Sequence, residues 1–362
     1  MKLHLVGGFL GSGKTTAIIA AARKLMRDGK RVGVVTNDQG RYLVDTAFFR
    51  ASDLPTVEVT GGCFCCNYHD LQTQVSDLVR TYNPDVIFAE SVGSCADMVA
   101  TVIKPLQQIG NFMQPASFSV FTDIRMFRRW VLGEQLPFSD DVLYIYEKQL
   151  EEANLLILNK IDLLPEKKVT SARVMAAGRF GDKYILAQQA NDEDRISGWV
   201  NLIQGNMFAI QRPSLHIDYE RYGFGESRLV WMDQRIQFFG EDSKSGDVSA
   251  CFIESMMSTL INESYLPAHI KFFVKSDQGN VKISFTGLDQ LEDGQVKSAL
   301  EGMEGTSIEI LINARLEGLM DNLQMLVEDA ARTCSAAHNW SFEADKPEIF
   351  HPGKPAPTQR IT

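Results

Sequence analysis

The sequence predicts an α/β domain with a mainly parallel, doubly wound sheet, followed by a smaller C-terminal α+β domain. In the first half, short apolar runs alternate with helix-like stretches, which is the pattern of βαβ units. Several runs are almost continuous Val, Ile, Leu and Phe, as expected for parallel strands covered by helices on both faces. After about residue 206 this alternation gives way to strands that follow one another closely.

The elements follow from these patterns in order. Strands of the first domain are expected at residues 2–6, 31–36, 86–89, 118–122, 155–159 and 184–187, with helices at 15–28, 71–82, 98–106 and 138–152. The second domain should contain strands at 228–239, 268–274, 281–285 and 307–312, with helices at 249–262 and 316–333. We expect domains at 1–205 and 206–340 and a flexible, Pro-rich tail at 341–362.

Composition excludes several classes of protein. The 362 residues carry a net charge of −10, and Lys and Arg are scattered, which argues against nucleic acid as a partner. No apolar run approaches the roughly 18 to 20 residues that span a bilayer. The chain begins directly with a strand, so no signal peptide is expected. Three of six cysteines lie within four residues, a pattern typical of metal or redox chemistry in a cytoplasmic protein.

A glycine-rich segment lies between the first expected strand and helix. Its sequence is Gly-Phe-Leu-Gly-Ser-Gly-Lys-Thr, a phosphate-binding loop, and the first domain is therefore expected to be a P-loop NTPase. Backbone N–H groups and the positive end of the helix would face the phosphates. Lys14 should reach the β- and γ-phosphates, and the Thr15 hydroxyl should bind Mg²⁺. The predicted nucleotide-binding residues here are Gly8, Gly11, Ser12, Gly13, Lys14, Thr15 and Thr16.

The sequence Asn159-Lys160-Ile161-Asp162 follows a later strand and indicates which base is bound. The Asp162 carboxylate would accept hydrogen bonds from the N1–H and the exocyclic amine of guanine. Adenine offers no such pair of donors, so it would leave the carboxylate unpaired. GTP and GDP are therefore favoured over adenine nucleotides.

Two further strand ends carry polar residues. Glu90, in Glu90-Ser91-Val92-Gly93, is a candidate catalytic residue together with Lys14; it would either face the Mg²⁺ shell or orient the attacking water. The segment Asn37-Asp38-Gln39-Gly40, continuing to Asp45, is interpreted either as a switch near Mg²⁺ or as an ordinary polar turn.

The sequence Gly62-Cys63-Phe64-Cys65-Cys66 is a candidate metal site. Thiolates bind Zn²⁺ and similar ions, and three from one short loop leave a coordination position open, which suits transfer. A redox pair or an inert buried trio are the alternatives. His69 is either a fourth ligand or a surface histidine.

Other candidates are weaker. Cys95, Cys251 and Cys334 are isolated and are interpreted as core or surface residues. His269 and Lys271 lie on an expected strand and either meet a partner or a metal or form a solvated face.

Taken together, the phosphate loop, the segment from Asn37 to Asp45, Gly-Gly-Cys-Phe-Cys-Cys, Glu-Ser-Val-Gly and Asn-Lys-Ile-Asp resemble the CobW-type GTPases, relatives of the urease- and hydrogenase-maturation GTPases. The motifs occur in the family's order over residues 7–162. Asp38 stands where the family commonly has Glu, and the segment after residue 187 (Gln188-Gln189-Ala190-Asn191) lacks the family's usual Ser-Ala start.

The resemblance implies a slow, Mg²⁺-dependent GTPase that acts as a metallochaperone or metal-insertion factor. Cys63, Cys65 and Cys66 would hold the cargo, Zn²⁺ or Co²⁺, and GTP turnover would gate its delivery to a client metalloprotein. Nucleotide-dependent homodimers are expected by analogy. The alternatives are a corrinoid- or cobalamin-related maturation factor that remodels a client, and a redox sensor without GTPase activity.

Overall fold

The computed structural model describes residues 1–362 apart from residues 38–39, 41–43, 110–114, 206–211, 264 and 290–293. The described chain forms two compact units. Unit 1 comprises Met1–Gln39, Phe49–Glu226 and Gly353–Thr362, and unit 2 comprises Gly40–Phe48 and Ser227–Pro352. The division between the units therefore lies later than residue 205, and both ends of the chain belong to unit 1. Within the described ranges, no helix is long and apolar enough to cross a membrane.

Unit 1 contains a seven-stranded sheet of order β3-β2-β4-β1-β5-β6-β7, and every neighbouring pair is parallel. The doubly wound α/β class is confirmed. The strands are β1 (Lys2–Gly8), β2 (Val32–Asn37), β3 (Thr56–Val59), β4 (Val86–Glu90), β5 (Pro115–Asp123), β6 (Leu155–Asn159) and β7 (Tyr184–Ala187). All six expected strands are present, but β3 was missed because its four residues lie partly exposed at the sheet edge and lack a strong apolar run.

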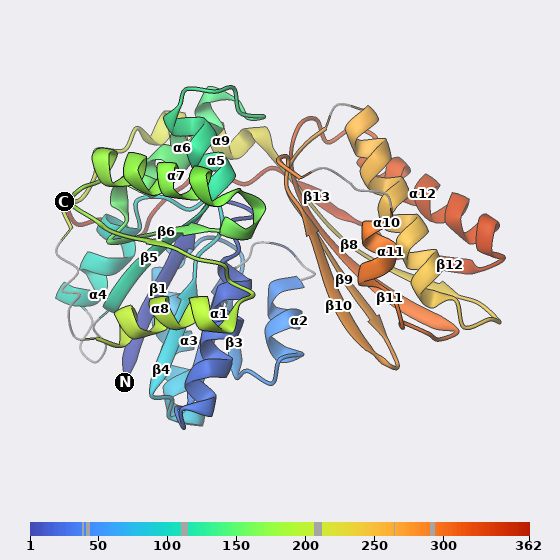
Figure 1. The fold of residues 1–362 in the computed structure, drawn as a ribbon, viewed down its shortest axis with the longest axis horizontal. Helices are drawn as coiled ribbons and strands as arrows, with labels where there is room; N and C mark the ends of the chain where they lie inside the picture. The colour runs from blue at the N-terminus through green and yellow to red at the C-terminus, as the bar shows by residue number, and fades with distance from the viewer. Residues whose placement is uncertain (38–39, 41–43, 110–114, 206–211, 264, 290–293) are drawn as a thin grey trace. The chain divides into compact units, whose positions relative to one another are not determined.

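Helices pack around this sheet, with α1 and α8 side by side (Figure 1). The helices of unit 1 are α1 (Lys14–Arg27), α3 (Tyr68–Tyr82), η1 (Val99–Ile103), α4 (Lys104–Gln108), α5 (Ile124–Val131), α6 (Asp140–Glu152), η2 (Ile161–Leu163), α7 (Glu166–Arg179), α8 (Glu193–Gln204) and α9 (Tyr219–Arg228), whose last two residues belong to unit 2. Because all strands are parallel, their carboxyl ends meet at one edge of the sheet, where ligands bind in such folds. The phosphate loop follows β1 at that edge.

Unit 2 is the expected α+β domain, built on a separate antiparallel sheet of order β10-β9-β11-β8-β12, with β13 also paired to β8. Its elements are α2 (Val44–Arg50, which extends into unit 1), β8 (Leu229–Phe239), α10 (Ser245–Asn262), β9 (Leu266–Ser276), β10 (Gly279–Phe285), α11 (Gln295–Ala299), β11 (Ser307–Glu317), α12 (Leu323–His338), β12 (Ser341–Ala344) and β13 (Glu348–Phe350). The apolar residues of its sheet and helices form one continuous core.

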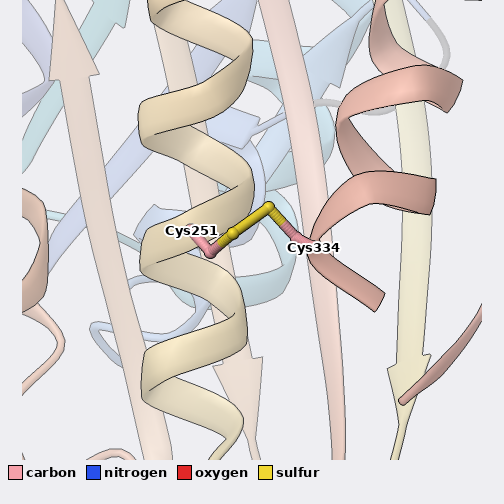
Figure 2. Close-up of a disulfide and its surroundings, with 2 residues drawn as sticks. All are labelled: Cys251 and Cys334. Carbon is pink, nitrogen blue, oxygen red and sulfur yellow. A yellow bond between two sulfur atoms is a disulfide. The ribbon is translucent and has the colours of Figure 1, made fainter. Parts of the chain in front are cut away.

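Two expectations about the C-terminal half are wrong. Cys251 and Cys334 are not isolated: they form a disulfide that joins α10 to α12 (Figure 2). Residues 341–362 are not a loose tail, because β12 and β13 pair with β8 and Gly353–Thr362 forms hydrogen bonds within unit 1. Proline density alone misled the prediction, since edge strands and extended segments also accommodate proline.

Candidate functional site

The phosphate loop adopts a backbone path that depends on its glycines. Gly8 has φ +127° and Gly13 has φ +88°, in the region that favours glycine. A Cβ atom at Gly8 would lie 2.1 Å from the carbonyl oxygen of Phe121, and one at Gly13 would lie 2.4 Å from Asn159 Nδ2. Both positions therefore require glycine for the loop to approach its neighbours this closely.

Lys14 and Thr15 open α1 directly after the loop. The Lys14 ammonium donates to the carbonyl oxygens of Gly8 (2.7 Å) and Phe9 (3.3 Å), so it lies over the loop. Thr15 Oγ1 donates to Glu90 Oε1 at 2.9 Å, which brings a hydroxyl at the start of α1 and a carboxylate at the end of β4 together. Hydroxyl and carboxylate oxygens are suitable ligands for Mg²⁺, directly or through water. Gly11 and Ser12 are buried, and Thr16 is half-buried one residue further along the helix.

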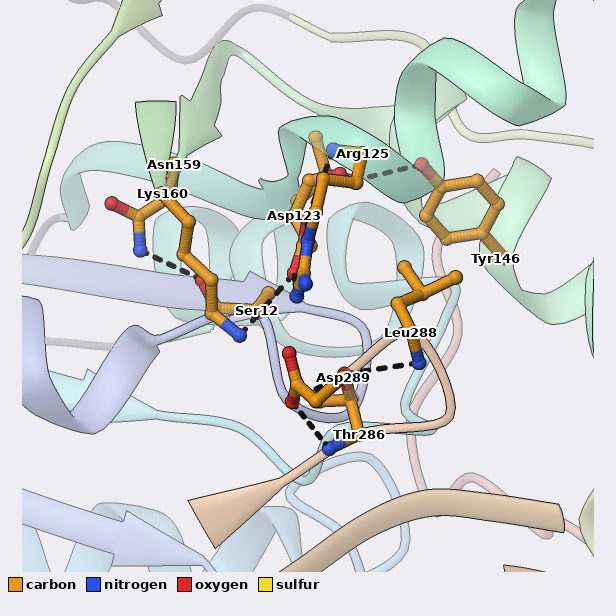
Figure 3. A network of polar contacts seen from close by, with 10 residues as sticks. Ser12, Asp123, Arg125, Tyr146, Asn159, Lys160, Thr286, Leu288 and Asp289 are labelled. Carbon is orange, nitrogen blue, oxygen red and sulfur yellow. Dashed lines mark hydrogen bonds and ion pairs between the residues drawn. The ribbon is translucent and has the colours of Figure 1, made fainter. Parts of the chain in front are cut away.

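The Asn-Lys-x-Asp segment meets the phosphate loop at the end of β6 (Figure 3). The buried Asn159 amide donates to the Ser12 carbonyl at 2.8 Å. Lys160 has φ +62° and pairs with Asp123 at 3.3 Å. The Asp162 side chain is exposed. The contacts of Asn159 and Lys160 thus hold the segment in place, and the side chain of Asp162 is left facing solvent.

Asp123 was missed by the sequence analysis. It ends β5, caps α5 and forms an ion pair with Arg125 at 2.6 Å (Figure 3). Burial opposes ionisation of this carboxyl, but the hydrogen bond from Arg125 and the charge of Lys160 hold its pKa below the usual value. An ionised Asp123 therefore orients Lys160. A lone Asp at a strand end gave no signal that distinguished it from an ordinary helix cap.

The three clustered cysteines converge. Cys63 Sγ lies 2.8 Å from Cys65 Sγ and 3.1 Å from Cys66 Sγ, and the other two sulfurs are 3.8 Å apart. The three sulfurs form a group within 4.8 Å of one another that could hold a metal ion. Cys63 and Cys65 are buried, whereas Cys66 is half-buried. Around a tetrahedral zinc with Zn–S bonds of about 2.3 Å, sulfurs are separated by about 3.8 Å, so small outward shifts would fit this loop to an ion.

Asn37 positions the cysteine loop. Its side-chain amide donates to the carbonyls of Val59 (3.0 Å) and Gly62 (2.7 Å), and its oxygen accepts from the Phe64 N–H at 2.8 Å. The loop closes on itself, because the N–H groups of Cys66 and Asn67 both donate to the Cys63 carbonyl. Asn37, expected in a switch near Mg²⁺, thus braces the backbone on both sides of Cys63.

The C-terminal segment also contacts this loop. The Thr358 N–H donates to the Cys65 carbonyl at 3.0 Å, and the Ala356 N–H lies 3.4 Å from Cys66 Sγ. Arg360 forms a 2.8 Å ion pair with the buried Asp97. We refer to Gly353–Thr362 as the C-terminal strap. No sequence pattern indicated this contact, because about 290 residues separate its partners.

The remaining predicted residues fall elsewhere. His69 is exposed on α3 and is not part of the sulfur group, which supports its interpretation as a surface residue. Asp45, on α2, pairs with Lys271 and with Lys282 (2.8 Å) of unit 2. Lys271 is therefore not a freely solvated side chain, and its strand is bonded to both β10 and β11. Asp38 and Gln39 lie outside the described residues.

Comparisons with known proteins identify the protein family that the first half of the chain resembles. Residues 2–181 match the model of the CobW/HypB/UreG nucleotide-binding domain. The chain is 27% identical to the zinc chaperone CobW of Sinorhizobium sp over 212 residues, covering 52% of this chain and 59% of the relative. It is 27% identical to the zinc chaperone YeiR of Escherichia coli (strain K12) over 200 residues, covering 53% and 56% respectively.

Among solved structures, HypB from Helicobacter pylori in complex with nickel aligns with a TM-score of 0.44 and 16% identity, covering 60% of this chain and 92% of that one. The matches span less than two thirds of the curated relatives named above. Through the matched region, which contains the phosphate loop, the cysteine loop and the Asn-Lys-x-Asp segment, the chain belongs to the CobW/HypB/UreG family.

Proposed function

We propose that this protein is a Mg²⁺-dependent GTPase whose nucleotide state controls the binding and delivery of a metal ion held by Cys63, Cys65 and Cys66. The observation that carries the proposal is the convergence of these three sulfurs on a P-loop domain. The metal ion is cargo, and Zn²⁺ and Co²⁺ both suit thiolates. The two curated relatives described above are both called zinc chaperones, which favours Zn²⁺.

The nucleotide chemistry rests on the contacts around the phosphate loop. Lys14 would leave the carbonyls of Gly8 and Phe9 and neutralise the β- and γ-phosphates. Mg²⁺, when bound, supplies charge stabilisation at the phosphates, and Thr15 and Glu90 would hold it directly or through water. Asp162 would select guanine, while Asn159 and Lys160 hold its segment in place. Metaphosphate-like transfer needs little more than this positioning and charge.

The metal chemistry rests on a loop that is braced yet partly open. Binding displaces the protons of the thiols, since thiolates are the ligands. Hydrogen bonding with Cys63 raises the pKa of both Cys65 and Cys66, which favours their protonated forms before an ion binds. Half-buried Cys66 leaves one side of the group accessible, which suits transfer to a client metalloprotein in the cytoplasm.

Coupling between the two sites follows from adjacent strands. Asn37 ends β2 and braces the cysteine loop, Glu90 ends β4 and contacts Thr15, and β2 pairs with β4. A change in Mg²⁺ coordination that moves the end of β4 would therefore also move the end of β2, and with it the cysteine loop. Such coupling must be reciprocal: if GTP alters metal affinity, metal alters GTP affinity by the same factor.

The test is Co²⁺ affinity of the reduced full chain in its nucleotide-free, GDP and non-hydrolysable GTP forms, repeated with Cys65→Ser. We expect a thiolate-dependent affinity that differs at least about fivefold between GDP and GTP forms. Identical affinities in all three forms would remove the metal switch. GTP-dependent, metal-independent capture of a client would then favour the alternative, nucleotide-driven remodelling of a metalloenzyme such as a corrinoid protein.

A further inference from the structure

The C-terminal strap is anchored through Arg360 and Ile361. The Arg360 guanidinium pairs with Asp97 at 2.8 Å and donates to the Leu215 carbonyl at 2.9 Å. The Ile361 N–H donates to the Ala100 carbonyl at 2.8 Å. All of these residues belong to unit 1, so the bonds lie within one compact unit. The strap is therefore held at a defined place by side-chain and backbone groups together.

Asp97 is a specific partner for this guanidinium. Its side chain is 1% exposed, and its backbone has φ +65°, a conformation that residues other than glycine rarely adopt. Asp97 Oδ2 accepts from the Tyr219 hydroxyl at 2.7 Å and from Arg360 Nε at 2.8 Å. Among the described residues, Arg360 is the one cation that pairs with this carboxylate. A buried carboxylate that loses its counter-charge is strongly destabilising, so Asp97 favours the anchored position of the strap.

The strap reaches the cysteine loop two to four residues before Arg360. The Thr358 N–H donates to the Cys65 carbonyl at 3.0 Å, and the Thr358 hydroxyl lies 3.4 Å from the same oxygen. The Ala356 N–H lies 3.4 Å from Cys66 Sγ. An extended chain spans at most about 3.6 Å per residue, so an anchor at Arg360 limits how far Thr358 can move. The contact with sulfur becomes charge-assisted when Cys66 is a thiolate, and such bonds are roughly twice as strong as neutral ones.

We propose that Arg360 is a positioning residue of the metal site, which holds the strap against Cys65 and Cys66 and so slows release of the bound ion. The inference rests on the proposed function and adds a part of the chain that supplies no thiol. The ion pair with Asp97 fixes the strap, and the strap places the Ala356 N–H at the Cys66 sulfur. That hydrogen bond stabilises the thiolate of the loaded protein, so Arg360 acts through the strap and not as a ligand.

The proposal implies a reciprocal effect of the ion on the strap. If the anchored strap stabilises the loaded metal site by some factor, the bound ion stabilises the anchored strap by the same factor. The Ala356 and Thr358 N–H groups should then exchange with solvent more slowly in the loaded protein, because each must leave its acceptor to exchange. Pro355 and Pro357 carry no N–H, so few other amides contribute to the signal of this segment.

The first measurement is the rate of Zn²⁺ release from the reduced full-length protein to an excess of chelator. Arg360→Ala should release Zn²⁺ about tenfold faster than wild type, because more than one bond between the strap and the cysteine loop is weakened. The association rate should stay within about twofold, since the charge-assisted bond forms only with the thiolate. Arg360→Lys keeps a cation for Asp97 and should restore most of the wild-type rate. Gln359→Ala is the matched control, because this exposed neighbour forms no side-chain hydrogen bond or ion pair with any described residue.

A second variant covers the case in which Arg360→Ala does not fold. Asp97→Asn combined with Arg360→Ala removes the buried charge together with the anchor, and this double variant should release Zn²⁺ as fast as the single one. The wild type supplies a further readout that needs no substitution. Hydrogen exchange of residues 353–362 should be slower with bound Zn²⁺ than without it.

The outcomes separate this inference from the proposed function. A wild type that binds no Zn²⁺ through its thiols would remove both proposals. Thiolate-bound Zn²⁺ whose release is unchanged in Arg360→Ala and in the double variant would overturn the role of Arg360 and leave the three-cysteine site intact. The same conclusion would follow from strap exchange that does not respond to Zn²⁺. Equal acceleration in Gln359→Ala would also overturn it, since any change in the strap would then suffice.

Discussion

The phosphate loop can be recognised from one contiguous motif, whereas the contacts that hold the cysteine loop come from distant parts of the chain. Gly8 to Thr15 form one uninterrupted segment whose positive φ angles and helix start are local properties. The cysteine loop is braced by Asn37 on β2 and contacted by the C-terminal strap. This difference shows that a short sequence motif can identify the candidate metal ligands without revealing the distant residues that position them.

The largest effect that sharpens this comparison is expected at Lys14. Lys14→Ala removes the ammonium that would neutralise the γ-phosphate, and GTP hydrolysis should fall by about 10² to 10³-fold or more. Its ammonium donates to two carbonyls of the phosphate loop and lies in a different motif from the three thiols, so Co²⁺ affinity should stay within about twofold of wild type. Steady-state phosphate release and Co²⁺ titration measure the two properties. An equal loss of both in a folded variant would show that the regions are not separable.

The same contrast explains what could be predicted. Nearly every strand of the parallel sheet followed from its apolar run, and the phosphate loop and the cysteine group followed from contiguous motifs. Ala356 gave no signal, because a lone alanine acquires a role at this site only through a residue far away in sequence. The disulfide between Cys251 and Cys334 was not predicted for the same reason, since 83 residues separate the two cysteines.

Asp45, expected in a switch segment near Mg²⁺, lies on α2 and forms ion pairs with Lys271 and Lys282. Burial raises the pKa of this carboxyl, but Lys271 and Lys282 outweigh it and hold the pKa well below 3.8. Asp45→Asn leaves two lysines without their buried anion, so unit 2 should lose about 3 kcal/mol of unfolding free energy at pH 7. Urea denaturation measures this loss, with the exposed Asp277→Asn as the control.

The pH dependence of that loss has a definite sign. A carboxyl whose pKa is lowered by folding stabilises the native state fully above its unfolded pKa and less as pH falls toward the folded value. The difference between wild type and Asp45→Asn should therefore be constant from pH 7 to about pH 5 and shrink below about pH 4. A difference that grows on acidification would contradict the ion pairs. Little change in GTP hydrolysis is expected, in contrast to a switch role for Asp45.

Asn37 tests whether the cysteine loop depends on a distant brace. Asn37→Ala removes all three bonds that hold the backbone at Val59, Gly62 and Phe64, so the thiols lose their preset arrangement. Groups that orient metal ligands typically contribute 10- to 100-fold in metal affinity, and we expect a Co²⁺ affinity loss in that range. Asn67→Ala is matched, since it removes one exposed bond to Thr60 in the same loop. Equal losses in both variants would mean that Asn37 has no special role.

The smallest effect is expected at the C-terminal strap. Ala356→Pro removes the N–H that lies 3.4 Å from Cys66 Sγ, while Ala356→Gly keeps it. Ala356 already precedes Pro357, which restricts it to extended conformations that proline also adopts, so the change mainly removes a donor. One such hydrogen bond contributes about 1 kcal/mol, so Zn²⁺ release to a chelator should accelerate about fivefold in Ala356→Pro and not in Ala356→Gly. Equal Zn²⁺ release rates in the two variants would mean that the strap does not affect metal retention. Faster release in Ala356→Pro alone would show that the strap helps to retain the metal.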